Sequence, residues 1–242
     1  MCYVLPAPRP LVSWGTPGPA MIVPEQTTAD ALTARYDVGG RHFLRLTLRG
    51  ADLRQANLSD ATFKVFDASG SDLFGANFYG SEFEQVELRG CNLVGADLSR
   101  SRGAIVDLSR ASLAGSRMLE VRLMEANMPG TDLTSVNLRG ARLEANLEGA
   151  NLTRANLEGA VLDGSFAWGA NFDRANLAGA HLAGVKLRRT YFGGADMRDA
   201  VLDGADLRGA DLRTANLRGA SFTGALLDGA LFPHERHAHA NP

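Results

Sequence analysis

Hydrophobic and polar positions alternate with a period of five over most of the chain. Each unit has a small residue, then Asn or Asp, then a large apolar central residue, followed by two mostly polar or Gly positions. Residues 150–159, ANLTRANLEG, hold two copies of this unit. A period of five fits neither an α-helix, with its period of 3.6, nor a half-buried strand, with its period of two. A fixed repeat of this kind indicates a repeat architecture without a single globular core.

The central residues follow one another every five positions from Phe43 to Leu143 and again from Leu147 to Phe232. The four-residue step between the two series is the only change of phase, and we expect it to distort one corner near the middle of the repeats. A second departure is Gly103, which stands where a large central residue is expected. It predicts a local void or a bulge, because nothing there fills the interior.

The unit A-(D/N)-L-x-x resembles the signature of the pentapeptide-repeat family. The resemblance implies an all-β solenoid, a right-handed quadrilateral β-helix with four units per square coil. In that fold the central residue and the small residue two positions before it point inward. Four units per coil give about ten coils and, at ~4.8 Å between stacked strands, a rod roughly 46 Å long.

Twenty residues per coil predict that residues twenty apart stack on one another. Phe43, Phe63 and Phe83 are consecutive central residues of one face and fit this expectation. On another face Gly recurs two positions after the central residue, interrupted by Arg110 and Arg189. The glycines are Gly50, Gly70, Gly90, Gly130, Gly149, Gly169, Gly209 and Gly229. Because a type II turn needs a positive φ at its third residue, this corner predicts a ladder of such turns.

The chain divides into three parts. Residues 1–40 begin with a Pro-rich arm, since six of the nine prolines fall in residues 1–24, and continue into a short helix predicted from Thr27 to Tyr36. This helix is expected to cap the first coil, whose apolar interior and pairing edge need cover. Residues 41–232 form the solenoid, and residues 233–242 form a flexible tail.

Composition argues against several functions. The chain has 25 basic and 27 acidic residues and a formal charge of −2, so it shows no electrostatic footprint for direct nucleic-acid binding. It has no apolar run long enough for a membrane span. Its N-terminus lacks a basic region before an apolar one, which predicts a cytoplasmic protein without a signal peptide. Its two cysteines, Cys2 and Cys91, make no disulfide framework.

Enzyme chemistry and cofactor binding find little support in the sequence. Most carboxylates belong to the repeat, and a filled solenoid offers no pocket. His234, His237 and His239 near the C-terminus leave two readings open, a transition-metal site or a flexible His-rich tail. The sequence therefore predicts a binding protein without catalytic residues, bound metal or cofactor.

A third departure from the repeat lies at Ser165-Phe166-Ala167-Trp168, where Ala167 is the central residue and aromatics occupy the flanking positions. If the frame holds, Phe166 and Trp168 emerge on one face, near basic residues of the next coil at positions 186, 188 and 189. Exposed aromatic residues beside Arg are typical of interaction hot spots. In the alternative, Phe166 turns inward to fill the space left by Ala167.

Two functional hypotheses follow. The chain is similar to the topoisomerase-protecting branch of the family, which includes quinolone-resistance proteins and self-resistance proteins of antibiotic producers. That resemblance implies a DNA-mimicking rod that binds DNA gyrase or topoisomerase IV. Residues 51–98 hold eight acidic residues against three basic ones, whereas residues 99–142 hold seven Arg against four acids. In the alternative, the rod is a scaffold or adaptor for other proteins with no topoisomerase role.

The sequence suggests contact residues for both kinds of partner. Asp72, Glu82, Glu84, Glu87 and Trp168 are the predicted partner-binding residues. A second copy of the chain is another expected partner, because the final coil has no capping helix after it. Its apolar residues predict a C2 homodimer interface. These residues are Leu226, Leu227, Leu231 and Phe232.

Overall fold

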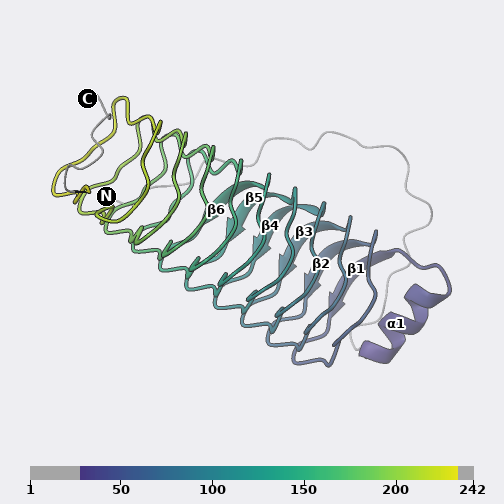
Figure 1. Cartoon of the computed structure of the whole chain (residues 1–242). Helices are drawn as coiled ribbons and strands as arrows, with labels where there is room; N and C mark the ends of the chain where they lie inside the picture. Colours follow the sequence, from purple (N-terminus) through teal and green to yellow (C-terminus); the bar gives the residue numbers. More distant parts are fainter. Residues whose placement is uncertain (1–27, 234–242) are drawn as a thin grey trace, which may run out of the picture.

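The computed structural model describes residues 28–233. The chain is a parallel β-solenoid that winds into a rod, with one helix at the N-terminal end (Figure 1). Six strands form one parallel sheet in chain order. They are β1 (His42–Thr47), β2 (Thr62–Asp67), β3 (Glu82–Glu87), β4 (Arg102–Asp107), β5 (Arg122–Asn127) and β6 (Arg142–Asn146). The solenoid predicted from the five-residue period is confirmed.

Residues twenty apart lie directly over one another, as predicted. Phe43 pairs with Phe63 and Phe63 with Phe83 in the register of β1 to β3. Their rings stack with centroids 5.2 and 5.9 Å apart. Isolated bridges continue the same spacing beyond β6 as far as Leu231. Central residues and the small residues two before them form one buried cluster along the rod, because each coil packs against the next.

One corner of the rod is a ladder of tight turns. The turn at Leu48 closes with a hydrogen bond from the Ala51 nitrogen to the Leu48 carbonyl, 3.3 Å long, and Gly50 has a φ of 64°. The prediction of positive φ along this ladder is confirmed. Arg110 and Arg189 adopt the same conformation, with φ of 57° and 54°. Gly is therefore favoured at this corner but not required, since tertiary contacts impose the left-handed conformation on Arg as well.

The four-residue step ends the six-stranded sheet. β5 and β6 pair at Leu123 with Leu143 and again at Ala126 with Ala145, so two residues of β5 lie opposite the single residue Glu144. Such an irregularity locally changes the pairing and direction of a strand. In the coils before the step, the corner that follows the central residues Phe43, Phe63 and Phe83 lies inside the continuous strands β1 to β5. In the coils after the step, the same corner is a hydrogen-bonded turn. Within the described residues, β6 is followed only by isolated bridges. The expected distortion of one corner is confirmed.

The wall at Gly103 has neither a void nor a bulge, so that prediction is wrong. Gly103 pairs with Phe83 in an unbroken register between β3 and β4. A Cβ atom at residue 103 would lie 2.8 Å from the Phe83 Cβ and 3.1 Å from a methyl group of Val106. The neighbouring coil has therefore closed over the position, and the absence of a side chain permits that close packing.

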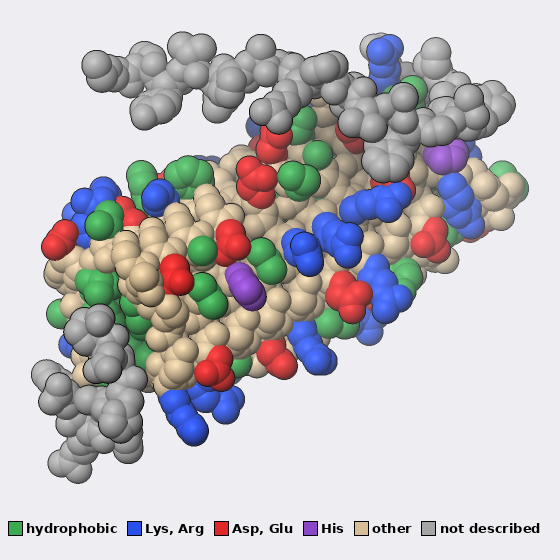
Figure 2. Space-filling view, turned by 90° about the horizontal axis from the view of Figure 1, so that it is seen from above, with side chains coloured by type: hydrophobic (Ala, Val, Ile, Leu, Met, Phe, Trp, Pro, Cys, Tyr) green, Lys and Arg blue, Asp and Glu red, His purple; other side chains and the backbone are tan. Residues whose placement is uncertain are grey.

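A helix, α1 (Ala29–Asp37), covers the first coil. Thr28 is its N-cap, and the Thr28 hydroxyl accepts a hydrogen bond of 3.2 Å from the Ala31 nitrogen. Leu32 and Tyr36 are buried in the core cluster. The Tyr36 hydroxyl donates a 2.9 Å hydrogen bond to the Ser59 carbonyl, which ties the helix to the first coil. Outside the core, acidic and basic side chains are interspersed along the face seen in Figure 2.

Candidate protein-binding surface

One column of outward-facing residues is polar over its first half and has a single aromatic residue, Phe166, in its second half. Each member pairs with its counterpart in the next coil. We call it the Phe166 column. It contains Thr47, Asp67, Glu87, Asp107, Asn127, Asn146, Phe166, Lys186, Asp206 and Leu226. The residues two positions later in sequence lie beside it on the same wall, because side chains alternate between the two faces of an extended chain.

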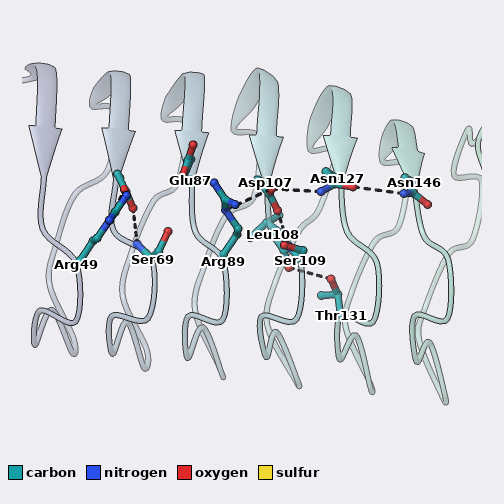
Figure 3. A network of polar contacts seen from close by, with 11 residues as sticks. Arg49, Ser69, Glu87, Arg89, Asp107, Leu108, Ser109, Asn127, Thr131 and Asn146 are labelled. Carbon is teal, nitrogen blue, oxygen red and sulfur yellow. Dashed lines mark hydrogen bonds and ion pairs between the residues drawn. The ribbon is translucent and has the colours of Figure 1, made fainter. Parts of the chain in front are cut away.

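The first half of the Phe166 column is a network of hydrogen bonds and ion pairs (Figure 3). Its contacts join Arg49 to Asp67, Arg89 to Glu87 and Asp107, Asn127 to Asp107, and Asn146 to Asn127. Partial burial would raise the pKa of the Asp67 carboxyl, but hydrogen bonds from Ser69 and Arg49 outweigh it and lower that pKa. In this half of the wall, the charged side chains therefore pair with one another.

The second half of the column exposes the aromatic side chain of Phe166, and Trp168 is exposed beside it. Phe166 is 50% exposed and Trp168 is 42% exposed, while Ala167 between them is buried. Their ring centroids lie 6.4 Å apart in an edge-to-face arrangement. The alternative in which Phe166 turns inward is therefore wrong, and the frame of the repeat holds through this unit. The chain keeps these two apolar rings in solvent beside each other.

Basic side chains of the following coils complete this cluster. The Arg188 guanidinium lies 5.9 Å from the centre of the Trp168 ring, within range of a cation–π contact. Arg188 Nε also lies 2.6 Å from Asp206 Oδ2. Arg208 approaches the two oxygens of the same carboxylate with Nε and a terminal nitrogen, each at 2.8 Å. Lys186 stacks on Phe166 in the backbone register.

Asp206 is the centre of this arrangement, since it is only 4% exposed and receives two guanidinium groups. A charge-assisted contact of this kind fixes the orientation of an Arg side chain. We define the Trp168 patch as the six residues of this cluster. They are Phe166, Trp168, Lys186, Arg188, Asp206 and Arg208. The patch combines an apolar pair with three positive charges and one negative charge.

The four predicted acidic contacts do not form one patch. Glu82, Glu84 and Glu87 all lie on β3, whereas Asp72 lies in a different column of isolated bridges. Each also has a basic partner. Glu82 pairs with Arg102, Glu84 with Lys64 at 2.7 Å, Glu87 with Arg89 at 2.5 Å, and Asp72 with Arg54 at 3.8 Å. Trp168 lies several coils away from all four.

The acidic segment 51–98 is largely neutralised by its neighbours in space. Three of its carboxylates pair with Arg residues that lie outside the segment in sequence. Asp67 pairs with Arg49, Glu82 with Arg102, and Asp97 with Arg117. The partners come from adjacent coils, since stacked residues are about twenty positions apart. Counting charges along the sequence therefore overstates the negative charge of this end of the rod.

The predicted dimer residues lie in the last coil of the solenoid. Leu226, Leu227, Leu231 and Phe232 are between 36% and 46% exposed. The Phe232 ring contacts Phe222 edge to face at 5.8 Å. This end therefore presents apolar side chains, as the sequence predicts, and the homodimer remains a proposal.

The residues between 28 and 233 contain no group of three or more His, Cys, Asp or Glu side chains placed to hold a metal ion. The three C-terminal histidines lie outside the described residues. Cys91 is buried, its thiol donates to the Ala68 carbonyl at 3.0 Å, and burial raises its pKa to about 11. It therefore lacks the thiolate character of a reactive cysteine. Within the described part of the chain, no helix is long and apolar enough to cross a membrane.

Sequence reasoning found Trp168 and missed Asp206 and Arg208. The missed pair belongs to a recurrent Asp-x-Arg spacing, in which the two side chains emerge on the same wall. The same contact occurs between Asp52 and Arg54 and between Asp211 and Arg213. Combining that spacing with the twenty-residue register would have placed Asp206 beside Arg188 and revealed the whole cluster.

Fold and surface together define a class of protein, a parallel β-solenoid whose candidate binding residues lie in exposed columns along the rod. The chain belongs to the pentapeptide-repeat family, since the model for pentapeptide repeats matches eight copies over most of the chain. The matched residues are 43–64, 69–102, 107–144, 144–177, 156–194, 175–213 and 195–232. No curated protein matches the chain significantly.

Several solved structures of pentapeptide-repeat proteins are similar to this chain. HetL, a pentapeptide-repeat protein involved in heterocyst differentiation regulation in the cyanobacterium Nostoc, is 29% identical, and the match covers 86% of this chain and 98% of HetL with a TM-score of 0.37. Full-length QnrB1, a plasmid-mediated fluoroquinolone resistance protein, is 19% identical over 77% of this chain and 92% of QnrB1, with a TM-score of 0.37. A thylakoid-lumen pentapeptide-repeat protein of Arabidopsis thaliana is 27% identical over 42% and 65% of the two chains, with a TM-score of 0.23.

Proposed function

We propose that this chain is a non-enzymatic binding protein and that the Trp168 patch is its principal contact with a partner protein. The observation that carries the proposal is the exposed pair of Phe166 and Trp168 beside an Arg188 held by the buried Asp206. Trp and Arg are, with Tyr, the residues enriched in binding hot spots. An Arg fixed before binding loses less side-chain entropy on association, so more of the contact energy appears as affinity.

The charge of the patch describes the partner that would fit it. Lys186, Arg188 and Arg208 bring three positive charges, and Asp206 offsets one of them. A partner with an apolar pocket for Trp168 and acidic groups around that pocket would match both features. The rest of the rod acts as a rigid support, because its coils are packed continuously from end to end.

The test is to remove one aromatic side chain and compare it with a matched control. A photocrosslinker at position 148, which is exposed one coil before Trp168 in the same register, identifies the bound protein, and one at position 191 reports background on another wall. Calorimetry with that partner should then show that Trp168→Ala weakens binding at least tenfold. Tyr191→Ala removes an aromatic side chain that is 44% exposed and should leave the affinity unchanged. Equal affinity for wild type and Trp168→Ala would refute the proposal.

A second candidate function, which would use other residues than the Trp168 patch, is that the partner is DNA gyrase or topoisomerase IV, which the rod would protect from poison antibiotics. The rod shape and the three carboxylates Glu82, Glu84 and Glu87 on one strand support it. The protein would act in the cytoplasm by occupying the DNA-binding surface of the enzyme, and no bond would be made or broken. The ion pairs of these carboxylates oppose the idea, because a DNA mimic needs negative charge that is free to meet the enzyme.

A supercoiling assay with purified gyrase, with and without a poison, tests this second function directly. DNA mimicry predicts that the rod inhibits supercoiling or rescues it from the poison, and that a variant with Asp72, Glu82, Glu84 and Glu87 changed to the amides loses the effect. No inhibition, no rescue and no binding to either topoisomerase would leave the scaffold or adaptor role. That alternative is favoured by the mixed charges along the rod and by the position of Trp168 away from the acidic residues.

The exposed last coil supports a homodimer as a separate part of the proposal. Two copies joined through Leu226, Leu227, Leu231 and Phe232 would cover each other's apolar end and its unpaired backbone edge. Light scattering over a range of concentrations should show a dimer for the wild type and a monomer for Phe232→Glu. A strict monomer at high wild-type concentration would contradict it.

A further inference from the structure

Three arginines stand in one line on the sheet. Arg102 of β4 pairs in register with Arg122 of β5, which pairs with Arg142 of β6. The same column begins at His42 and continues beyond β6 to His181. These are the two histidines within the described residues. At ~4.8 Å between strands, the three side chains emerge within about 10 Å of one another along the rod.

This arrangement does not stabilise the rod. Like charges directly opposite each other on neighbouring strands are destabilising. Arg102 is compensated by an ion pair with Glu82. Within the described residues, Arg122 and Arg142 form no ion pair, although other Arg residues of the solenoid, such as Arg198 with Asp196 at 2.6 Å, are paired. Two exposed guanidinium groups therefore remain available for another molecule.

Apolar residues stand beside two of the three arginines, whereas Glu144 takes the corresponding place after Arg142. Ala104 and Met124 lie two residues after Arg102 and Arg122 on the same strands, and Met124 is 59% exposed. In the next coil, Val161 takes the place of Arg in the column. The strip thus combines a short run of positive charge with neighbouring hydrophobic side chains, and it has no aromatic residue in β4, β5 or β6.

We propose that Arg102, Arg122 and Arg142 form a docking strip for a short acidic segment of a partner protein. Alternate side chains of an extended segment lie about 7 Å apart on one face, so two of its carboxylates would lie within the length of the strip. Each could accept paired hydrogen bonds from a guanidinium group. Met124 and Val161 would contact apolar side chains of the same segment. The strip is a separate column from the Trp168 patch, so this inference does not rest on the function proposed above.

The neighbouring carboxylates favour a protein segment over a nucleic acid. Glu120, Glu125 and Glu144 are exposed in the same coils as the three arginines. They would repel a phosphate backbone that continues past the strip, whereas a short acidic segment can end within it. Single-stranded nucleic acids also need aromatic side chains on which their bases stack, and these strands carry none.

The test measures binding of a defined probe to the full chain. The probe is a fluorescein-labelled peptide of ten residues that alternates Glu with Ala, followed by fluorescence anisotropy at low salt. The double variant Arg122→Gln, Arg142→Gln should weaken binding at least tenfold. The control is the double variant Arg110→Gln, Arg154→Gln, which removes the same total charge. Both arginines are exposed at corners of the rod and form no ion pair within the described residues, so the affinity should change less than twofold.

Three outcomes would overturn the proposal. They are no binding of the peptide to the wild type, equal weakening by the two double variants, and tighter binding of an oligothymidine of equal charge that is lost in the Arg122 and Arg142 variant. Urea unfolding gives an independent check that the variants are folded. Because the arginines repel one another, the midpoint of Arg122→Gln should equal or exceed that of the wild type.

Discussion

Replacing Phe63 by Ala tests the stacked core at a residue that contacts four other aromatic rings. Phe63 is fully buried and touches four other rings. Its centroid lies 5.2 Å from Phe43, 4.9 Å from Phe66, 5.8 Å from Phe78 and 5.9 Å from Phe83. A buried Phe→Ala change costs about 3–5 kcal/mol through lost transfer energy and the cavity left behind. We expect a value near the upper end, since each aromatic pair adds about 0.5–1.5 kcal/mol beyond its buried area.

Urea unfolding followed by circular dichroism gives the free energy of unfolding. Hydrogen exchange then shows which coils lose stability. Each coil contacts only its neighbours, so amide protection should fall in β1 to β3 and persist around Phe172 and Phe192. Phe74→Ala is the matched control, because Phe74 is 45% exposed and its removal should cost less than about 1 kcal/mol.

Two results would refute this reasoning. A loss below about 1 kcal/mol for Phe63→Ala would mean that the rings do not form a packed core. An equal loss of protection at both ends of the rod would mean that unfolding is global and that the stability is not a sum over neighbouring coils.

Three further outcomes are expected. Gly103→Ala should cost about 1–3 kcal/mol in urea unfolding, because the new Cβ would lie 2.9 Å from the Phe83 carbonyl oxygen, and an unchanged midpoint would contradict the close packing. The hydrogen bond and charge of Arg54 lower the pKa of Asp52 to about 2, so their stabilising contact is present above pH 3.8 and is lost as the pH falls through about 2. NMR titration of Arg54→Gln should return the Asp52 midpoint toward 3.8, and no change would refute the assignment. Cys91, with its pKa raised to about 11, should resist iodoacetamide at pH 8 until urea is added, as peptide mass mapping would show.

The fold was predictable because one local rule is repeated with little change. The spacing of Phe43, Phe63 and Phe83 alone indicated their stacking, and neighbouring coils then determine the rest of the register. The closure over Gly103 was not predictable, since it depends on how the neighbouring coil with Phe83 relaxes. Sequence patterns show where a side chain is missing but not whether its surroundings move in.

The candidate site was predictable only in part. The exposed position of Trp168 followed from the five-residue frame. Phe166 could either turn inward to fill the space beside Ala167 or keep its place in the register, and the structure shows that it keeps the register and stays exposed. The charge of the acidic coils was misjudged for a different reason. Electrostatic partners such as Glu82 and Arg102 are close because they lie one coil apart. The net charge of a sequence segment does not include partners from outside that segment.

The constant length of the coil makes the rod a spacer that can be adjusted in two independent ways. Inserting twenty residues between Arg142 and Phe166 would move the arginine strip and the aromatic patch about 4.8 Å farther apart without changing the direction in which either faces. Inserting five residues would instead rotate everything beyond the insertion by a quarter of the circumference. Distance and orientation between two binding surfaces can therefore be varied separately in this molecule.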